Sequence, residues 1–146
     1  MSRNYTVSIK IRRPVNEVFD AVVSGDRLSR YFTDNTSGDL VAGERIVWNW
    51  EAWGDHPVTV ETVDTNSRIE LKLNSGDWQK TSGDDYDVKV IFEFEETDDG
   101  NTRLSISEEG WPTDADGLKG SHDNCGGWMH MATCLKAYLE HDIDLR

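Results

Sequence analysis

An apolar stripe near the C-terminus is the feature that most constrains how this chain can fold. Its residues fall within about 140° of arc when successive positions are turned by 100° on a helix, so they form one continuous face. The stripe consists of Cys125, Trp128, Met131, Ala132, Leu135, Tyr138 and Leu139. Ser121 is a suitable N-cap, and Asp123 would lie favourably in the first turn. We therefore predict a helix of about five turns that begins near Ser121 and buries one face.

The segment 37–109 has the two-residue periodicity of strands. Its clearest part places Tyr86, Val88, Val90, Phe92 and Phe94 on one face. The turn residues at 98–101 then predict a hairpin to the strand that carries Leu104 and Ile106. The sequence thus predicts consecutive antiparallel strands, with the inner face supplied by alternate residues.

The N-terminal segment predicts one strand followed by two short helices. Residues 5–11 alternate between apolar and polar side chains, and Pro14 is placed as the first residue of a helix. Gly25 separates this helix from a second one that carries Leu28, Tyr31 and Phe32. The expected architecture is an α+β fold, in which a curved antiparallel sheet of about six or seven strands wraps around the long C-terminal helix.

Length and charge limit the possible classes of protein. The 146 residues fit one domain, 1–146, which can bury a sizeable core. With 28 acidic and 15 basic residues, the formal net charge of −13 disfavours nucleic acid and anionic membranes as partners. The acidity is compatible with a salt-rich cytoplasm or with ordinary solubility. No apolar run approaches the ~20 residues of a membrane span, and the N-terminus does not look like a signal peptide, so we expect a cytoplasmic protein.

The order of these elements resembles the helix-grip superfamily, which includes START lipid-transfer domains, birch-pollen-allergen relatives and polyketide cyclases. Within it, the chain is similar to bacterial homologues of the C-terminal domain of the heat-shock-protein ATPase activator. The residues that carry the resemblance are Pro14 with Val15, Val18 and Phe19, the strand 43–50, Gly110-Trp111, Gly127-Trp128, Leu135 and Tyr138-Leu139-Glu140. The resemblance covers nearly the whole chain and depends on the order of the motifs.

The resemblance implies a cavity between the sheet and the last helix. In such families the cavity can bind a lipid or another apolar molecule, or can carry out cyclisation chemistry. The activating role belongs to eukaryotic relatives and requires a chaperone partner. This sequence offers only the one domain, so that role remains an alternative.

Aromatic residues are the main functional lead, because six tryptophans are many for a chain of this length. Several large rings on one inner face are hard to pack without gaps, and such gaps suit flat or aliphatic ligands. The alternative is that the rings simply fill a solid core. The predicted ligand-binding residues are Phe32, Trp48, Trp50, Val60, Leu71, Val90, Phe92, Trp111, Trp128, Met131 and Leu135.

Trp53, His56 and Trp78 lie in polar segments that we predict to be loops. Exposed tryptophans in loops are typical of contact sites. These three residues are therefore expected at the mouth of the cavity or on a surface that binds a partner.

Catalytic and metal-binding patterns are weak. Glu51 and Glu61 face outward by strand alternation, whereas Glu108 shares the inward parity of Leu104 and Ile106. A buried Glu108 could act as an acid or base, but we expect it to be solvated at the end of its strand. His122 and Cys125 lack the further ligands that zinc requires, and we predict neither a metal nor a cofactor.

The function we predict from the sequence is the binding of a small apolar or aromatic molecule between sheet and helix, without catalysis. A chaperone-activating interaction module and a cyclase-like or hydrolytic enzyme in the same cavity remain alternatives. Any reactive role for Cys125 or Cys134 is disfavoured, because we place Cys125 on the apolar core side, which raises a thiol pKa.

Overall fold

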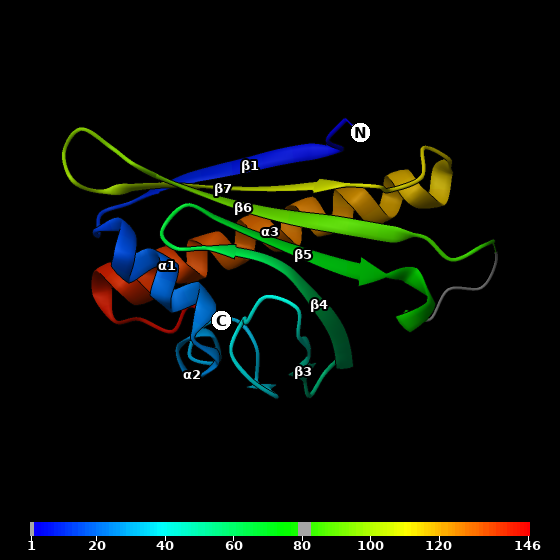
Figure 1. Cartoon of the computed structure of the whole chain (residues 1–146), viewed down its shortest axis with the longest axis horizontal. Coiled ribbons are helices and arrows are strands. Elements are labelled where there is room, and N and C mark those ends of the chain that lie inside the picture. Colours follow the sequence, from blue (N-terminus) through cyan, green and yellow to red (C-terminus); the bar gives the residue numbers. More distant parts are fainter. Residues whose placement is uncertain (1, 79–82) are drawn as a thin grey trace.

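Seven antiparallel strands form one sheet in the order β1-β7-β6-β5-β4-β3-β2 (Figure 1). The computed structural model describes residues 2–78 and 83–146. The strands are β1 (Tyr5–Ile11), β2 (Asn35–Thr36), β3 (Arg45–Trp50), β4 (Gly54–Asp64), β5 (Arg68–Asn74), β6 (Asp87–Glu96) and β7 (Thr102–Glu109). The helices are α1 (Val15–Val23), α2 (Gly25–Leu28), the short 3-10 helix η1 (Ser75–Asp77) and α3 (Ala115–His141). This architecture confirms the predicted helix-grip α+β fold, but α2 ends at Leu28, so Tyr31 and Phe32, which we predicted on the second helix, lie after it.

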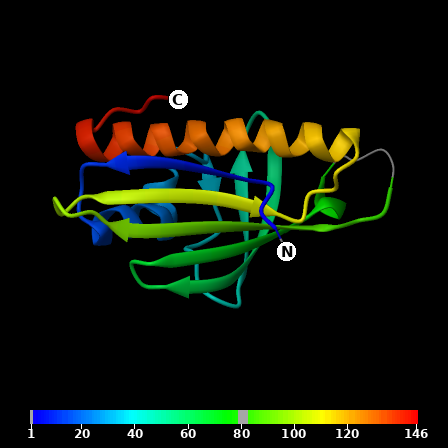
Figure 2. The same cartoon turned by 90° about the horizontal axis from the view of Figure 1, so that it is seen from above.

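The sheet is curved and holds α3 along its inner face (Figure 2). The register between β4 and β5 shifts between Val60 and Thr62, which bends the eleven-residue strand β4. At the other edge, β1 pairs with β7 over its full length and also contacts α3. The helix therefore lies against the strand edge on one side and faces the inner surface of the bent sheet on the other.

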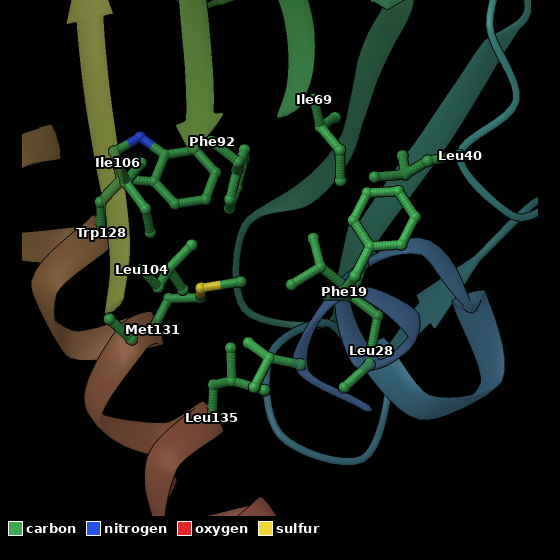
Figure 3. Packing of buried hydrophobic residues seen from close by; sticks show 14 of the residues in the cluster. Phe19, Leu28, Leu40, Ile69, Phe92, Leu104, Ile106, Trp128, Met131 and Leu135 are labelled. Atoms are coloured by element: carbon green, nitrogen blue, oxygen red, sulfur yellow. The ribbon is translucent and has the colours of Figure 1, made fainter. Parts of the chain in front are cut away.

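The hydrophobic core lies where α3, the sheet and the two small helices meet (Figure 3). Trp128, Met131 and Leu135 project from α3 toward the sheet residues Phe92 and Ile106. Phe19 of α1 closes this layer from the other end, with its ring 5.2 Å from that of Phe94. In the described part of the chain, no helix is long and apolar enough to cross a membrane.

Helix α3 begins six residues earlier than the predicted N-cap at Ser121. The cap is Asp114, whose side chain accepts a hydrogen bond from the Gly117 N–H at 2.8 Å. Ser121 is buried within the helix, and its hydroxyl donates to the Leu118 carbonyl. The polar residues of 113–120 predict a loop, and the structure instead places most of this segment in α3. Gly117 is needed for close packing, since a Cβ there would lie 2.1 Å from the Pro112 carbonyl oxygen.

The placement of the two cysteines also differs from the prediction. Cys134 is buried, whereas Cys125 is only half-buried. The reason is that α3 is covered on a second side, where the C-terminal segment folds back and the Arg146 guanidinium donates to the Thr33 and Arg30 carbonyls. Burial raises the pKa of the Cys134 thiol, so its thiolate is disfavoured.

Two adjacent glycines, Gly126 and Gly127, are tolerable in a helix if the backbone there packs closely on the sheet or bends, and the structure shows no close packing at either position. A Cβ at either position would have no heavy atom within 4 Å. Gly120 differs, because a Cβ there would lie 2.5 Å from Cζ3 of Trp111. Of these three glycines of α3, one therefore packs against a ring and two face open space.

This contrast predicts opposite effects of alanine in the same helix. Gly126→Ala should raise the free energy of unfolding by roughly 0.5–1 kcal/mol, because alanine has the higher helix propensity and meets no obstacle. Gly120→Ala should give no gain or a loss, because the Trp111 ring must move. Denaturant unfolding of both variants measures the difference, and equal gains would contradict the packing described.

Glu140 joins the C-terminal end of α3 to the end of β1. Its carboxylate accepts hydrogen bonds from the Arg12 backbone N–H at 2.8 Å and from Lys136 Nζ at 2.6 Å. The Arg12 guanidinium donates at 3.0 Å, and the Glu140 side chain is only 3% exposed. Burial alone would raise the pKa of this carboxyl, but the donated hydrogen bonds outweigh it and hold the pKa at about 2.

The contribution of Glu140 to the free energy of unfolding should therefore depend on pH. Its pKa is lowered on folding from 4.5 to about 2, so the contribution is present above pH 4.5 and is lost as the pH falls toward 2. Glu140→Gln should lower the free energy of unfolding at pH 7 by about 2–3 kcal/mol. In the variant, the free energy of unfolding should also fall less steeply as the pH is lowered from 4.5 toward 2. As a control, Glu17→Gln on α1 should change it by no more than about 0.5 kcal/mol, because that carboxylate is exposed. A pH series of urea melts that leaves the two variants alike would refute this role.

Candidate functional site

An open cavity of about 690 Å³ lies between the sheet and the part of α3 that runs from Gly120 to Cys134. The sheet contributes β3, β4 and β5, and further walls come from the segment after α2, from the segments around Trp78 and Trp111, and from Arg146. The lining residues are Tyr31, Phe32, Asp34, Trp48, Trp50, Trp53, His56, Pro57, Val58, Leu73, Trp78, Trp111, Gly120, Asp123, Asn124, Gly127, Trp128, His130, Met131, Cys134 and Arg146.

One face of α3 forms the helical wall of this cavity. Its lining residues recur at intervals of three or four, from Gly120 through Asn124 and Gly127 to Met131. Gly127 presents bare backbone to the space, since a Cβ there would touch nothing within 4 Å. A larger side chain at this position would enter the cavity, so glycine helps to keep the space open.

The aromatic residues of the walls form two groups. In the larger group, the Phe32 ring lies 5.0 Å from Trp50, 5.4 Å from Trp48 and 5.6 Å from Trp128, measured between centroids. In the second group, Trp78 stacks on Trp111 at 5.2 Å. The first group belongs to β3, α3 and the segment after α2, and the second to the segments that follow η1 and β7.

Glu108 connects the two aromatic groups. Its side chain is fully buried, and its Oε1 accepts hydrogen bonds from Trp111 Nε1 at 2.8 Å and from the Tyr5 hydroxyl. Its Oε2 accepts from Trp128 Nε1 at 3.0 Å and from Asn124 Nδ2 at 3.2 Å. Each carboxylate oxygen thus receives two donors, which fills the roughly four lone-pair positions that a carboxylate offers.

The surroundings of Glu108 explain why a carboxylate can occupy the interior. An ion without partners would be very costly there, whereas charge-assisted hydrogen bonds on every lone pair offset the loss of water. Burial and the neighbouring Glu108 carboxylate raise the pKa of the Tyr5 hydroxyl, so Tyr5 keeps its proton and stays a donor. Our expectation that Glu108 is solvated at the strand end is therefore wrong, although its inward parity was predicted.

The other indole N–H groups differ in how they are used. Trp50 Nε1 donates to the Phe32 carbonyl at 2.7 Å. Trp48 Nε1 is buried but has no hydrogen-bond partner among the described residues. Because Trp50, Trp111 and Trp128 already donate their N–H groups within the protein, their aromatic rings are what remains available to a ligand.

The charged lining residues Asp34, Asp123 and Arg146 take part in three ion pairs. Arg146 lies 3.8 Å from Asp34, and its guanidinium also contacts Asp144 at 3.0 Å. Asp123 pairs with Lys119 at 2.7 Å. Within residues 2–78 and 83–146, no cluster of three or more histidine, cysteine or acidic side chains has a geometry that could hold a metal ion.

The predicted binding residues divide into those that line the cavity and those that lie in the core behind it. Phe32, Trp48, Trp50, Trp111, Trp128 and Met131 line it. Val60, Leu71, Val90, Phe92 and Leu135 instead belong to the core cluster and do not line it. Strand parity identified the inner face correctly, but it could not tell which part of that face is filled by other side chains.

The three residues predicted at the mouth all line the cavity, but their local structures differ. Trp53 is 73% exposed in the turn between β3 and β4. His56 lies on β4 and not in a loop, with its ring 5.4 Å from that of Trp50. Trp78 follows η1, and the segment 79–82 of the predicted connection lies outside the described residues.

Sequence reasoning missed most of the polar lining. Asp34, Asp123, Asn124, His130 and Arg146 come from three distant parts of the chain. Of these polar residues, Asn124 carried a usable signal, because positions 120, 124, 127 and 131 share a face once the helix is known to begin at Ala115. Arg146 gave no such signal, since its placement depends on carbonyls more than a hundred positions away.

Comparison with protein families identifies the chain. The profile of the family described as activator of Hsp90 ATPase homolog 1-like protein matches residues 12–140. The chain belongs to this family. The match includes β2 to β7, α3 up to residue 140 and the residues that line the cavity up to Cys134, whereas β1 lies before it. No curated protein sequence matches the chain significantly.

Solved structures of similar proteins show the same fold. The protein SSP2350 from Staphylococcus saprophyticus has a TM-score of 0.76 at 23% identity, with 97% of this chain and 94% of that chain covered. The Aha1 dimer from Colwellia psychrerythraea has a TM-score of 0.76 at 19% identity, with 97% and 98% covered. DynU16, from the dynemicin biosynthetic locus, has a TM-score of 0.77 at 18% identity, and the match spans 97% of this chain but 48% of that one.

The hydrogen bonds to Glu108 predict an unusually large effect of an uncharged replacement. Glu108→Gln should lower the free energy of unfolding by about 2–4 kcal/mol, because the amide cannot accept from all of these donors and leaves buried N–H groups unpaired. The neighbouring Glu109→Gln, on the opposite face of β7, serves as the control and should change it by less than about 1 kcal/mol. Denaturant melts would contradict the role of Glu108 if both substitutions had the same small effect.

Proposed function

We propose that this protein binds a small hydrophobic or aromatic molecule in the cavity between the sheet and α3, without catalysing its conversion. The observation that carries the proposal is the open cavity of about 690 Å³ walled by Phe32 and six tryptophans. This volume falls in the range of small-molecule sites, which are mostly apolar with a few polar groups. Apart from Trp53, which is exposed, these rings are half-buried or buried, so they are held in place before a ligand arrives.

The state of Glu108 supports binding over acid–base catalysis. Glu108 is the acid that the sequence offered for chemistry, yet it does not line the cavity. Its four hydrogen bonds occupy both oxygens. A general base needs a free lone pair directed at the substrate. Glu108 is therefore better suited to holding the walls in position than to moving a proton.

Family membership favours a second candidate, a protein-interaction module that stimulates a chaperone ATPase. The matching family is described by that activity. The exposed face of the sheet would be the contact surface in that case. The two candidates differ in whether their activity depends on the open cavity. A ligand-binding protein needs the cavity, whereas an interaction module does not, and this difference can be measured.

The proposed function predicts that filling the cavity weakens binding. The neutral fluorescent probe N-phenyl-1-naphthylamine should bind saturably, with one molecule per chain, and should quench tryptophan emission. Gly127→Phe should weaken this binding roughly tenfold, because the new ring occupies part of the space beside Trp128. Gly126→Phe is the matched control, since Gly126 does not line the cavity, and it should bind the probe like the unaltered protein.

Other outcomes identify the alternatives. Absence of saturable probe binding, or equal weakening by both substitutions, would overturn the proposed site. Stimulation of a chaperone ATPase that survives Gly127→Phe would favour the interaction module. Turnover of a bound compound would favour an enzyme, and its loss in Glu108→Gln but not in Glu109→Gln would assign the chemistry to Glu108.

A further inference from the structure

The cavity has an electrostatic character that its apolar walls do not reveal. Two of its indoles, Trp111 and Trp128, donate their N–H groups to one buried carboxylate, that of Glu108. A hydrogen bond to an anion polarises the donor, and in a dry interior this polarisation is strong. It moves electron density onto the ring, and the face of an indole is already the best aromatic surface for a cation.

The negative charge of the Glu108 carboxylate also favours a cation in the cavity. Glu108 is fully buried, so its charge is only weakly screened by solvent and salt. It lies within hydrogen-bond distance of two rings that line the cavity, on the side away from the open space. A cation resting on those rings would therefore experience both the ring faces and the charge behind them.

The remaining charges around the cavity do not cancel this effect. Among the described lining residues, Arg146 is the basic group besides the histidines, and it is shared between Asp34 and Asp144. Asp123 is matched by Lys119. The carboxylates at and directly behind the cavity walls therefore outnumber the arginine and lysine side chains that pair with them. Within the described part of the chain, Glu108 is one of the carboxylates that have no cationic partner.

We infer that the ligand of this cavity is an organic cation with an apolar or aromatic body, such as a quaternary ammonium compound or a protonated aromatic amine. The inference rests on the proposed function and specifies its ligand class. The cation lies against the Trp111 and Trp128 rings, and Phe32 with the β3 tryptophans contacts the apolar body. The buried Glu108 carboxylate disfavours an anionic ligand of the same shape, which should bind more weakly than the cation or its neutral isostere.

Ligands of matched shape test the inference without altering the protein. Benzyltrimethylammonium, its neutral carbon isostere neopentylbenzene and the anion phenylmethanesulfonate are each used to displace N-phenyl-1-naphthylamine. The expected order of affinity is cation, neutral compound, anion, with the cation bound roughly tenfold more tightly than its isostere. If the neutral compound binds as tightly as the cation, the inference is overturned while the proposed function stands. If no probe or competitor binds, the proposed function fails first.

Salt concentration separates the buried carboxylate from the acidic surface. A preference that came from the net charge of −13 would disappear in 1 M NaCl, where the screening length falls to about 3 Å. A preference that comes from Glu108 and the polarised rings should persist there at no less than about fivefold. Its disappearance in 1 M NaCl would overturn the assignment to Glu108.

A substitution completes the test. In 1 M NaCl, Glu108→Gln should reduce the preference for the cation over its isostere to within about twofold, whereas Glu109→Gln should keep it. Circular dichroism establishes that each variant is folded. If Glu108→Gln does not fold, Trp128→Phe provides the second variant, because it keeps a ring on the wall but removes the N–H that donates to Glu108. Retention of the full preference in a folded Glu108→Gln protein would contradict the inference.

Discussion

The carboxylate of Glu108 is the group on which the geometry of the cavity depends. An ion can occupy the interior only when its lone pairs are satisfied. Its donors come from β1 through Tyr5, from the segment after β7 through Trp111, and from α3 through Asn124 and Trp128. One buried charge therefore joins the edge of the sheet, the entrance to the long helix and the helix itself. The two aromatic groups of the cavity keep their separation because both are attached to the same pair of oxygens.

Alternation and helical periodicity were sufficient to predict the fold. The strands, the α+β class and the long C-terminal helix follow from patterns that each extend over several residues, and such patterns average out local exceptions. The start of α3 could not be predicted in the same way. Its position depends on one cap, Asp114, and on a glycine whose hydrogen atom faces the Pro112 carbonyl. A single contact of this kind leaves no periodic signal, and the polar segment 113–120 predicts a loop instead.

The site was only partly predictable, for a related reason. The inward parity of Glu108 could be deduced, but its burial depends on Tyr5, which is 103 positions away, and on Asn124, which is 16 positions away. Parity also treats all inward residues alike, so it did not separate Trp48, which lines the cavity, from Val90, which lies in the core. That distinction depends on which side chains of other elements occupy the same space. It is a property of three-dimensional packing that the sequence does not display locally.

The pairing of β1 with β7 has a consequence for how the protein folds. The first strand can dock only after the last strand exists, because Tyr5 lies opposite Glu108 in the ladder. Contacts of such large sequence separation carry a high entropic cost and tend to form late. Before β1 docks, the Glu108 carboxylate lacks its Tyr5 donor and the edge of β7 is open to other strands. During synthesis, β1 therefore stays unpaired until β7 has emerged, and the cavity takes its final shape only after α3 and Arg146 have followed.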